Sequence, residues 1–164
     1  MRAHHGIAGK RAPELRVPHW LANVEGDLRL VDIDEPIIYL FSFQAWCPGC
    51  HHHGFPTLKT VREALIGKGL ADQVKFVVVQ TVFEGHDENT ADAAKKSLKE
   101  HDLADLALGH DSGDPPNLMV DYRAGGTPWT VIIGPRPDRT VLFNDFHVDA
   151  DNAVLAIEQT LTSL

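Results

Sequence analysis

The stretch Trp-Cys-Pro-Gly-Cys at positions 46–50 decides the fold, and it holds both cysteines of the 164-residue chain. Pro48 suits the first turn of a helix, where its missing N–H costs nothing. Thiols at a helix N-terminus meet unpaired amides and the positive end of the helix dipole, which favour a negative charge. Because thiolate is the reactive form of cysteine, the stretch predicts a nucleophile. Pro48 also disfavours helical angles at Cys47, so we expect Cys47 to be the exposed attacking sulfur and Cys50 to close a disulfide with it.

The segments on either side place this stretch at a strand-to-helix junction. Residues 37–43, Ile-Ile-Tyr-Leu-Phe-Ser-Phe, are an apolar run typical of a buried central strand. Residues 51–66 carry apolar side chains at helical spacing, with Pro56 inside the helix, where we expect a bend. Residues 74–82 give the strongest strand signal of the chain. The order strand, helix, strand predicts a βαβ unit with parallel strands.

Further elements are predicted on both sides of this unit. Residues 1–12 are basic, contain His and Gly and lack periodicity, so we expect a mobile tail before a single domain over residues 13–164. Extended character over residues 13–21 and apolar-polar alternation over residues 28–33 predict an N-terminal hairpin or extended pair. Beyond residue 82 the sequence predicts a helix at 90–100, a short strand at 105–109, a short helix at 118–122, a hairpin of strands at 129–133 and 140–143, and a closing helix at 149–161.

The composition argues against several kinds of partner. A net charge of −8 disfavours binding to nucleic acid or to an anionic membrane. No apolar run approaches the ~20 residues that span a bilayer, and the first residues lack the apolar segment of a secretory signal. We therefore expect a cytoplasmic protein, or a periplasmic one if a leader has been removed. A single C-x-x-C in a reducing compartment indicates redox or metal chemistry rather than a structural disulfide.

A second motif, Gly126-Thr127-Pro128, completes a pattern that resembles the thioredoxin-fold superfamily over residues 13–163. The likeness is strongest to its redoxin or TlpA-like branch, which is related to the peroxiredoxins. The resemblance implies an α/β thioredoxin-like fold: a central mixed β-sheet flanked by helices, with an N-terminal hairpin and an insert after the second core strand. It also implies that Pro128 is cis and faces the cysteines, which leaves the backbone of Thr127 free to pair with an extended substrate.

The chain departs from the family pattern in three places. Thioredoxin has a buried acid six residues before its first cysteine, but this chain has Phe41 there, so the usual proton acceptor for the resolving thiol is missing. Pro56 follows Cys50 by six residues instead of five, which predicts an extra residue in the first turns, as a bulge. A glutamate that TlpA-like proteins often carry after the second cysteine is replaced by a run of three histidines, residues 51–53.

Several residues near the cysteines are candidates for a role in the site, each with a plainer alternative. Trp46 is either a shield beside the disulfide, binding substrate together with Thr127 and Pro128, or core filling. One of His51 and His53 is a candidate proton relay or a charge that tunes the thiols, and the alternative is a solvated first turn of the helix.

Glu84 is a further candidate for proton relay. It follows the second core strand and is expected at the same end of the sheet as Cys47. The alternative is an ordinary solvated carboxylate in a loop.

These observations predict a thiol–disulfide oxidoreductase that uses a Cys47–Cys50 couple on disulfides of proteins or small molecules, with an upstream dithiol reductant or oxidant as partner. The chemistry needs no organic cofactor and no metal. One alternative is a metal-binding or metallochaperone module, with the two cysteines and a nearby histidine as ligands for copper(I) or zinc. A peroxiredoxin-like peroxidase is disfavoured. Its motif P-x-x-x-T/S-x-x-C needs a hydroxyl three residues before the cysteine, and Gln44 and Cys47 occupy those positions.

Overall fold

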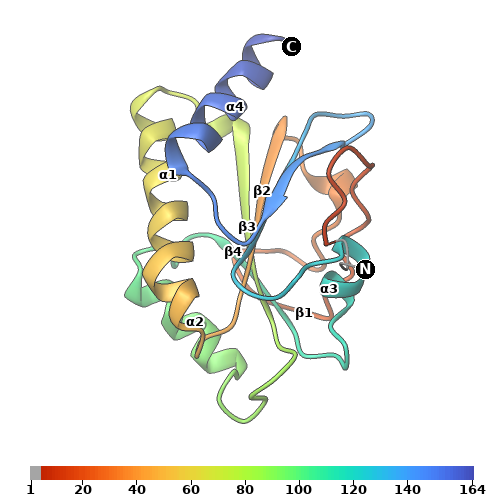
Figure 1. Cartoon of the computed structure of the whole chain (residues 1–164), viewed down its shortest axis with the longest axis vertical. Helices are drawn as coiled ribbons and strands as arrows, with labels where there is room; N and C mark the ends of the chain where they lie inside the picture. Colours follow the sequence, from red (N-terminus) through yellow and green to blue (C-terminus); the bar gives the residue numbers. More distant parts are fainter. Residues whose placement is uncertain (1–4) are drawn as a thin grey trace.

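A six-stranded sheet in the order β1-β4-β3-β2-β5-β6 forms the centre of the computed structural model, which describes residues 5–164 (Figure 1). Strand β2 pairs in parallel with β3 and antiparallel with β5, so the sheet is mixed. The predicted βαβ unit and the predicted closing hairpin are confirmed. The strands are β1 (His19–Ala22), β2 (Ile37–Phe43), β3 (Val74–Thr81), β4 (Ala107–Asp111), β5 (Trp129–Ile133) and β6 (Val141–Asp145).

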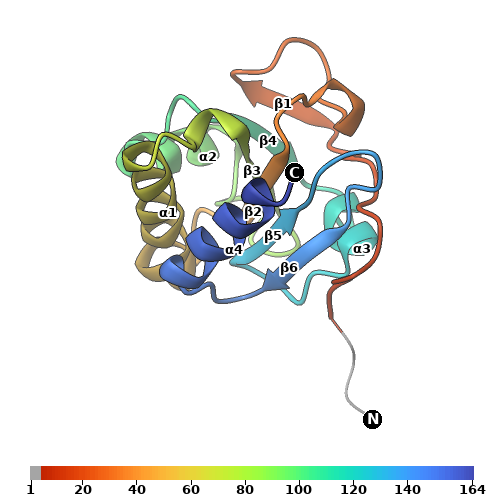
Figure 2. The ribbon, with the colours of Figure 1, turned by 90° about the horizontal axis from the view of Figure 1, so that it is seen from above.

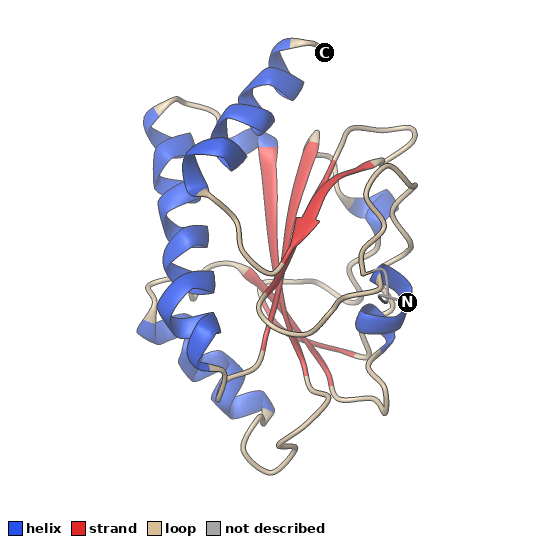
Figure 3. Ribbon diagram, in the orientation of Figure 1, coloured by secondary structure: helices blue, strands red, loops and turns tan. Residues whose placement is uncertain are grey.

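Helices cover both faces of the sheet, as Figures 2 and 3 show. One face carries α1 (Phe55–Gly67), α2 (Ala91–Glu100) and α4 (Ala150–Thr162). The other face carries the short helix α3 (Asn117–Tyr122). Among the described residues, no helix is long and apolar enough to cross a membrane.

Strand β2 is buried along its whole length because it supplies side chains to two separate apolar cores. Tyr39 and Phe41 face the layer of α1, α2 and α4, whereas Ile38 and Leu40 face α3 and the N-terminal segment. A strand covered on both faces has no polar alternation, which explains the continuous apolar run in the sequence.

The N-terminal hairpin expected over residues 13–33 does not form. Strand β1 pairs antiparallel with β4, and Leu30–Asp32 is a 3-10 turn with no buried residue. Val31 is 63% exposed, whereas Ile33 is buried and Leu28 and Leu30 pack against the apolar core, so the segment buries its apolar side chains from a turn instead of a strand. The free edge of β4 supplies the backbone partners instead. Helix α2 and strand β4, between β3 and α3, are the predicted insert after the second core strand.

Residues 5–12 are held against the edge of the sheet and do not form the mobile tail that their composition suggested. Ile7 is buried, and the backbone N–H of Gly9 and the carbonyl of Lys10 both bond to Val141 of β6, at 2.8 Å each. This contact could not be predicted from the composition, because its hydrogen bonds come from backbone groups, which every residue type except proline carries in the same form. Residues 1–4, the rest of that predicted tail, lie outside the described residues.

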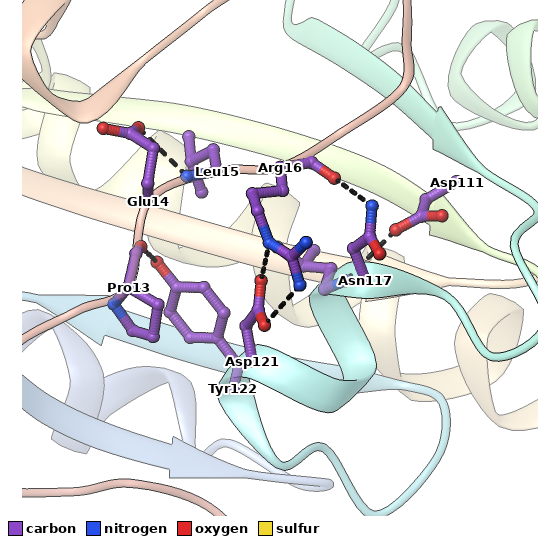
Figure 4. Close-up of polar contacts among 9 residues, drawn as sticks. Pro13, Glu14, Leu15, Arg16, Asp111, Asn117, Asp121 and Tyr122 are labelled. Carbon is purple, nitrogen blue, oxygen red and sulfur yellow. Dashed lines mark hydrogen bonds and ion pairs between the residues drawn. The ribbon is translucent and has the colours of Figure 1, made fainter.

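Helix α3 is tied to the N-terminal segment by side-chain contacts (Figure 4). The guanidinium of Arg16 donates two hydrogen bonds of 2.8 Å to Asp121, and the Tyr122 hydroxyl donates to the carbonyl of Pro13 at 2.5 Å. Asp111, at the end of β4, accepts the backbone N–H of Leu118 at 3.1 Å. These contacts close the face of the sheet opposite α1 and leave the carboxyl ends of β2 and β3 to build the site.

Candidate active site

The segment that follows β2 begins with a π-helical turn, Cys50–Gly54, before the regular helix α1. In this turn the backbone N–H of Phe55 reaches the carbonyl of Cys50, five residues back. The extra residue moves Pro56 into the first turn of α1, where its missing N–H leaves no hydrogen bond unmade. The bulge predicted from the position of Pro56 is therefore confirmed, and Pro56 is the second residue of the regular helix.

Gly54 lets the π-helical turn pack tightly against the sheet. A Cβ at this position would lie 2.5 Å from the ring of Phe41 and 3.1 Å from Cβ of Pro128. Phe41 is fully buried and packs edge-on against Phe55, at 5.1 Å between ring centroids. The ring that replaces the family's buried acid thus fills the space that a side chain at residue 54 would need.

The two thiols occupy different environments at this junction. Both are free; Cys47 is half-buried and Cys50 is fully buried. The Cys47 sulfur accepts the backbone N–H of Cys50 at 3.2 Å, and the thiol donates to the carbonyl of Thr127 at 3.6 Å. The sulfur of Cys47 therefore contacts both the start of the helical segment and the loop of residues 126–128, called the proline loop below.

These environments move the two thiol pKa values in opposite directions. A hydrogen bond from the Cys50 thiol is the largest influence on Cys47. Together with the Cys50 backbone N–H, a hydrogen bond with the Thr127 side chain and, as the smallest contribution, the charge of His51, it lowers the pKa of Cys47 from 9.0 to about 6, against the opposing effect of burial. Burial, followed by the hydrogen bond with Cys47, raises the pKa of Cys50. Cys47 is consequently the thiol that ionises near neutral pH.

The Thr127-Pro128 peptide bond is cis and lies beside the cysteines, as the sequence predicted. Trp46, in contrast, is 44% exposed, which excludes the core-filling alternative. Its ring lies against Gly85, where a Cβ would come within 2.7 Å of it. Trp46 therefore remains a candidate for contact with substrate, together with Thr127 and Pro128.

Three buried side-chain amides, which the sequence interpretation missed, hold the segment just before Cys47. Gln80 accepts the backbone N–H of Ala45 at 2.8 Å, and Asn89 accepts that of Trp46 at 2.9 Å. Gln44 joins the proline loop to the loop after β3, because it donates to the Thr127 hydroxyl at 3.4 Å and accepts the N–H of Phe83 at 3.2 Å. The sequence signal that could have identified two of them is a glutamine at the end of an apolar strand, as at Gln44 and Gln80.

The histidines after Cys50 point to different partners. His51 is half-buried, and both its ring nitrogens are hydrogen-bonded, one to the carbonyl of Ala45 at 2.6 Å and the other to His101 at 2.8 Å. His53 is exposed, and its ring meets His147 edge-on at 5.9 Å between centroids. His53 and His147 line a cavity of about 320 Å³, whose other lining residues are Gly54, Thr57, Thr130, Phe146 and Val148.

Glu84 contributes to the site through its backbone. Its N–H donates to Gln44 at 3.4 Å and its carbonyl accepts from Asn89 at 3.1 Å, while the residue itself is exposed. A relay role for its carboxylate stays a prediction.

A metal centre gains no support from this geometry. Within residues 5–164, no group of three or more His, Cys, Asp or Glu side chains is arranged to hold a metal ion. His51, the histidine next to Cys50, has both ring nitrogens engaged in hydrogen bonds. If a metal bound to the two thiols and His51, one of these two hydrogen bonds of His51 would have to break first.

Comparison with known proteins finds similar structures over nearly the whole chain. One, described as a thioredoxin-like superfamily protein, shares 31% of its sequence with this chain at a TM-score of 0.79, over 93% of this chain and 96% of its own. A thiol-disulfide isomerase from Corynebacterium glutamicum shares 27% at a TM-score of 0.72, over 92% and 96%.

A third structure, the thioredoxin domain of a thiol-disulfide oxidoreductase from Bacteroides vulgatus, has a TM-score of 0.67 over 93% of this chain and 96% of its own. Its sequence identity of 17% supports the fold alone. No protein-family model matches the sequence, and neither does any curated protein sequence.

Proposed function

The chain belongs to the thioredoxin-like superfamily, and from that premise we propose that it is a thiol–disulfide oxidoreductase whose reactive couple is the Cys47–Cys50 dithiol. The observation that carries the proposal is the contrast between the two thiols. Cys47 is half-buried with a pKa near 6, whereas Cys50 is buried with a raised pKa. A nucleophile and a resolving thiol need this difference.

The proposed reaction has two exchange steps. The Cys47 thiolate attacks one sulfur of a substrate disulfide, the substrate S–S bond breaks, and a mixed disulfide forms as the other sulfur leaves as a thiolate. Cys50 then loses its proton and attacks the Cys47 sulfur, which releases the second substrate sulfur. The substrate gains two electrons and two protons, and the protein ends with a Cys47–Cys50 disulfide that an upstream dithiol partner must reduce.

The surface around Cys47 supports an extended disulfide-containing substrate. The Thr127 carbonyl lies 3.6 Å from the Cys47 sulfur, so a strand that pairs with this backbone would bring its own disulfide to the nucleophile. Pro128 would contact the same substrate strand, and exposed Trp46 would shield the sulfur from water. Among the candidate proton relays, His51 has both ring nitrogens hydrogen-bonded, His53 lies in the cavity with His147, and Glu84 is a loop carboxylate.

The test is reduction of an insulin-type disulfide with a dithiol donor, measured beside the metal content of the purified protein. We expect turnover that depends on both cysteines, and no stoichiometric metal. Cys47→Ser and Cys50→Ser are the matched variants. Tight copper(I) or zinc binding together with no disulfide reduction would replace this proposal with the metallochaperone alternative.

A further inference from the structure

Two imidazole rings from different parts of the chain meet next to the cysteine pair. His51 comes from the π-helical turn, and His101 follows the last residue of α2, in the insert. Nδ1 of His51 lies 2.8 Å from Nε2 of His101, and the two rings stack at 5.1 Å between centroids. The ring of His101 also stacks on Phe55, at 4.4 Å. Neither histidine is fully exposed.

The hydrogen bonds determine where the protons of this pair lie. Nε2 of His51 is 2.6 Å from the carbonyl of Ala45, which can only accept, so this nitrogen carries a proton. Between Nδ1 of His51 and Nε2 of His101 there is room for one proton. If His51 becomes an imidazolium, both its N–H groups are satisfied, by Ala45 and by His101. A further proton on His101 at Nε2 would set two N–H groups against each other and break the bond.

We propose that His101 is a positioning residue that holds the shared proton on His51, and that the resulting His51 cation stabilises the Cys47 thiolate. His51 is one turn beyond Cys47, since its N–H donates to the Cys47 carbonyl at 3.4 Å. The inference rests on the proposed function only in taking Cys47 as the reactive sulfur. The proposal gives the insert a role in the site, because His101 directly follows α2.

The surroundings disfavour a cation on His101. Burial, and next the charge of His51, lowers the pKa of His101. Two acids and one base act on His101 as well: Glu100 and Asp102 favour its protonation, and Lys59 of α1, which bonds Asp102 at 3.1 Å, opposes it. On its other side His51 lines a cavity of about 280 Å³, whose charged lining residues are Glu88, Lys96 and Glu100.

The coupling between the pair and the thiol is reciprocal. A cation on His51 favours the Cys47 thiolate, and the thiolate favours the proton on His51. When Cys47 enters a disulfide the negative charge disappears, so the pair binds its proton less tightly.

Two substitutions of His101 separate this charge effect from packing. His101→Phe keeps a ring that can stack on Phe55 but removes both nitrogens. His101→Gln removes the ring, yet its side-chain oxygen can still accept the Nδ1–H of a charged His51. Thiolate formation at Cys47 is measured on the reduced protein by ultraviolet absorbance and by alkylation rate against pH. His52→Phe, which changes an exposed histidine of the same turn, is the matched control.

We expect His101→Phe to raise the midpoint of Cys47 ionisation by about one pH unit, a tenfold weaker acid, which is at the lower end of the effect of a neighbouring charge. His101→Gln should stay close to wild type, as should His52→Phe. A packing role predicts the reverse order, with Phe tolerated and Gln damaging. An unchanged midpoint in His101→Phe, or the reverse order, would overturn the proposal.

A second variant keeps the proposal testable if His101→Phe does not fold. His51→Gln should raise the Cys47 midpoint by a similar amount, and adding His101→Gln to it should change nothing more. An additional shift in the double variant would show that His101 does not act through His51. Because these measurements need no turnover, an inactive wild type would refute the proposed function alone, and an active enzyme with an insensitive midpoint would refute only this inference.

Discussion

Adding one methyl group at Gly54 should destabilise the protein by bringing two parts of the site into collision. In Gly54→Ala the new Cβ would lie 2.5 Å from the ring of Phe41, a separation far below van der Waals contact. Phe41 cannot swing aside cheaply, because it is fully buried and packs against Phe43 at 6.2 Å and Phe55 at 5.1 Å between ring centroids. Either the π-helical turn or the ring must move.

Overpacking of a rigid core costs about 1–3 kcal/mol in the free energy of unfolding. For a chain of this length each kcal/mol lowers the melting temperature by about 2–4 °C, so Gly54→Ala should melt roughly 2–12 °C below wild type. Thermal and denaturant unfolding of the reduced protein give both quantities. The reductase rate should fall as well, because the displaced turn carries Cys50 and touches Pro128.

The matched control lies at the end of the same helical segment. At Gly67, the last residue of α1, a Cβ would meet no atom within 4 Å, so Gly67→Ala should be neutral or stabilising by up to about 1 kcal/mol. Phe41→Leu added to Gly54→Ala should give a loss smaller than the sum of the two single losses, with a coupling of about 0.5–3 kcal/mol. Equal stability of the two alanine variants, or strict additivity with Phe41→Leu, would refute the collision argument.

Three further predictions follow from the site and the fold. Alkylation of the reduced protein should label Cys47 with a midpoint near pH 6 and leave Cys50 unlabelled; equal labelling would contradict the assignment. The pKa of Cys47 is lower in the folded than in the unfolded chain, so its contribution to stability is complete above pH 9.0 and lost as pH falls through about 6. The free energy of unfolding of the reduced wild type should therefore rise relative to that of Cys47→Ser as the pH increases from 6 to 9.0. A difference between the two proteins that does not change with pH would contradict this prediction. Gln80→Leu leaves the N–H of Ala45 without its acceptor and should cost about 1–3 kcal/mol in chemical denaturation, whereas an exposed change such as Gln159→Leu should cost almost nothing.

Local patterns were sufficient for the core of the fold. Strand β2 and its neighbours β3 and β5 carry long apolar runs, because both faces of these strands are covered. The bulge before α1 could also be predicted from the sequence, because proline is tolerated only at certain helical positions and Pro56 follows Cys50 by one residue more than in thioredoxin.

The N-terminal part could not be predicted in the same way because its partners are remote. His19 of β1 lies opposite His110 of β4, and residues 6–12 bond to backbone groups near residues 123 and 139–141. Nearby residues with extended character, 13–21 and 28–33, suggested a local hairpin, but Leu28 and Leu30 pack against the core from around a 3-10 turn and β1 pairs with β4. Local alternation cannot tell which strand edge will be free.

The polar framework of the site was missed for a related reason. Gln44, Gln80 and Asn89 resemble ordinary polar residues at strand and loop ends until the fold buries them. His101 resembles a residue that ends a helix, and its partner His51 is fifty residues away in sequence. Contacts of this kind arise from tertiary packing and leave no periodic pattern.

Trapping a mixed disulfide distinguishes the roles of the two thiols. Cys50→Ser and Cys47→Ser are each reacted with a disulfide substrate, and the covalent products are identified by mass spectrometry. We predict that Cys50→Ser accumulates substrate on Cys47, because attack proceeds and resolution is blocked. We predict that Cys47→Ser traps nothing, because the remaining thiol is buried with a raised pKa. Substrate bound through Cys50 in Cys47→Ser, or no adduct in Cys50→Ser, would contradict these roles.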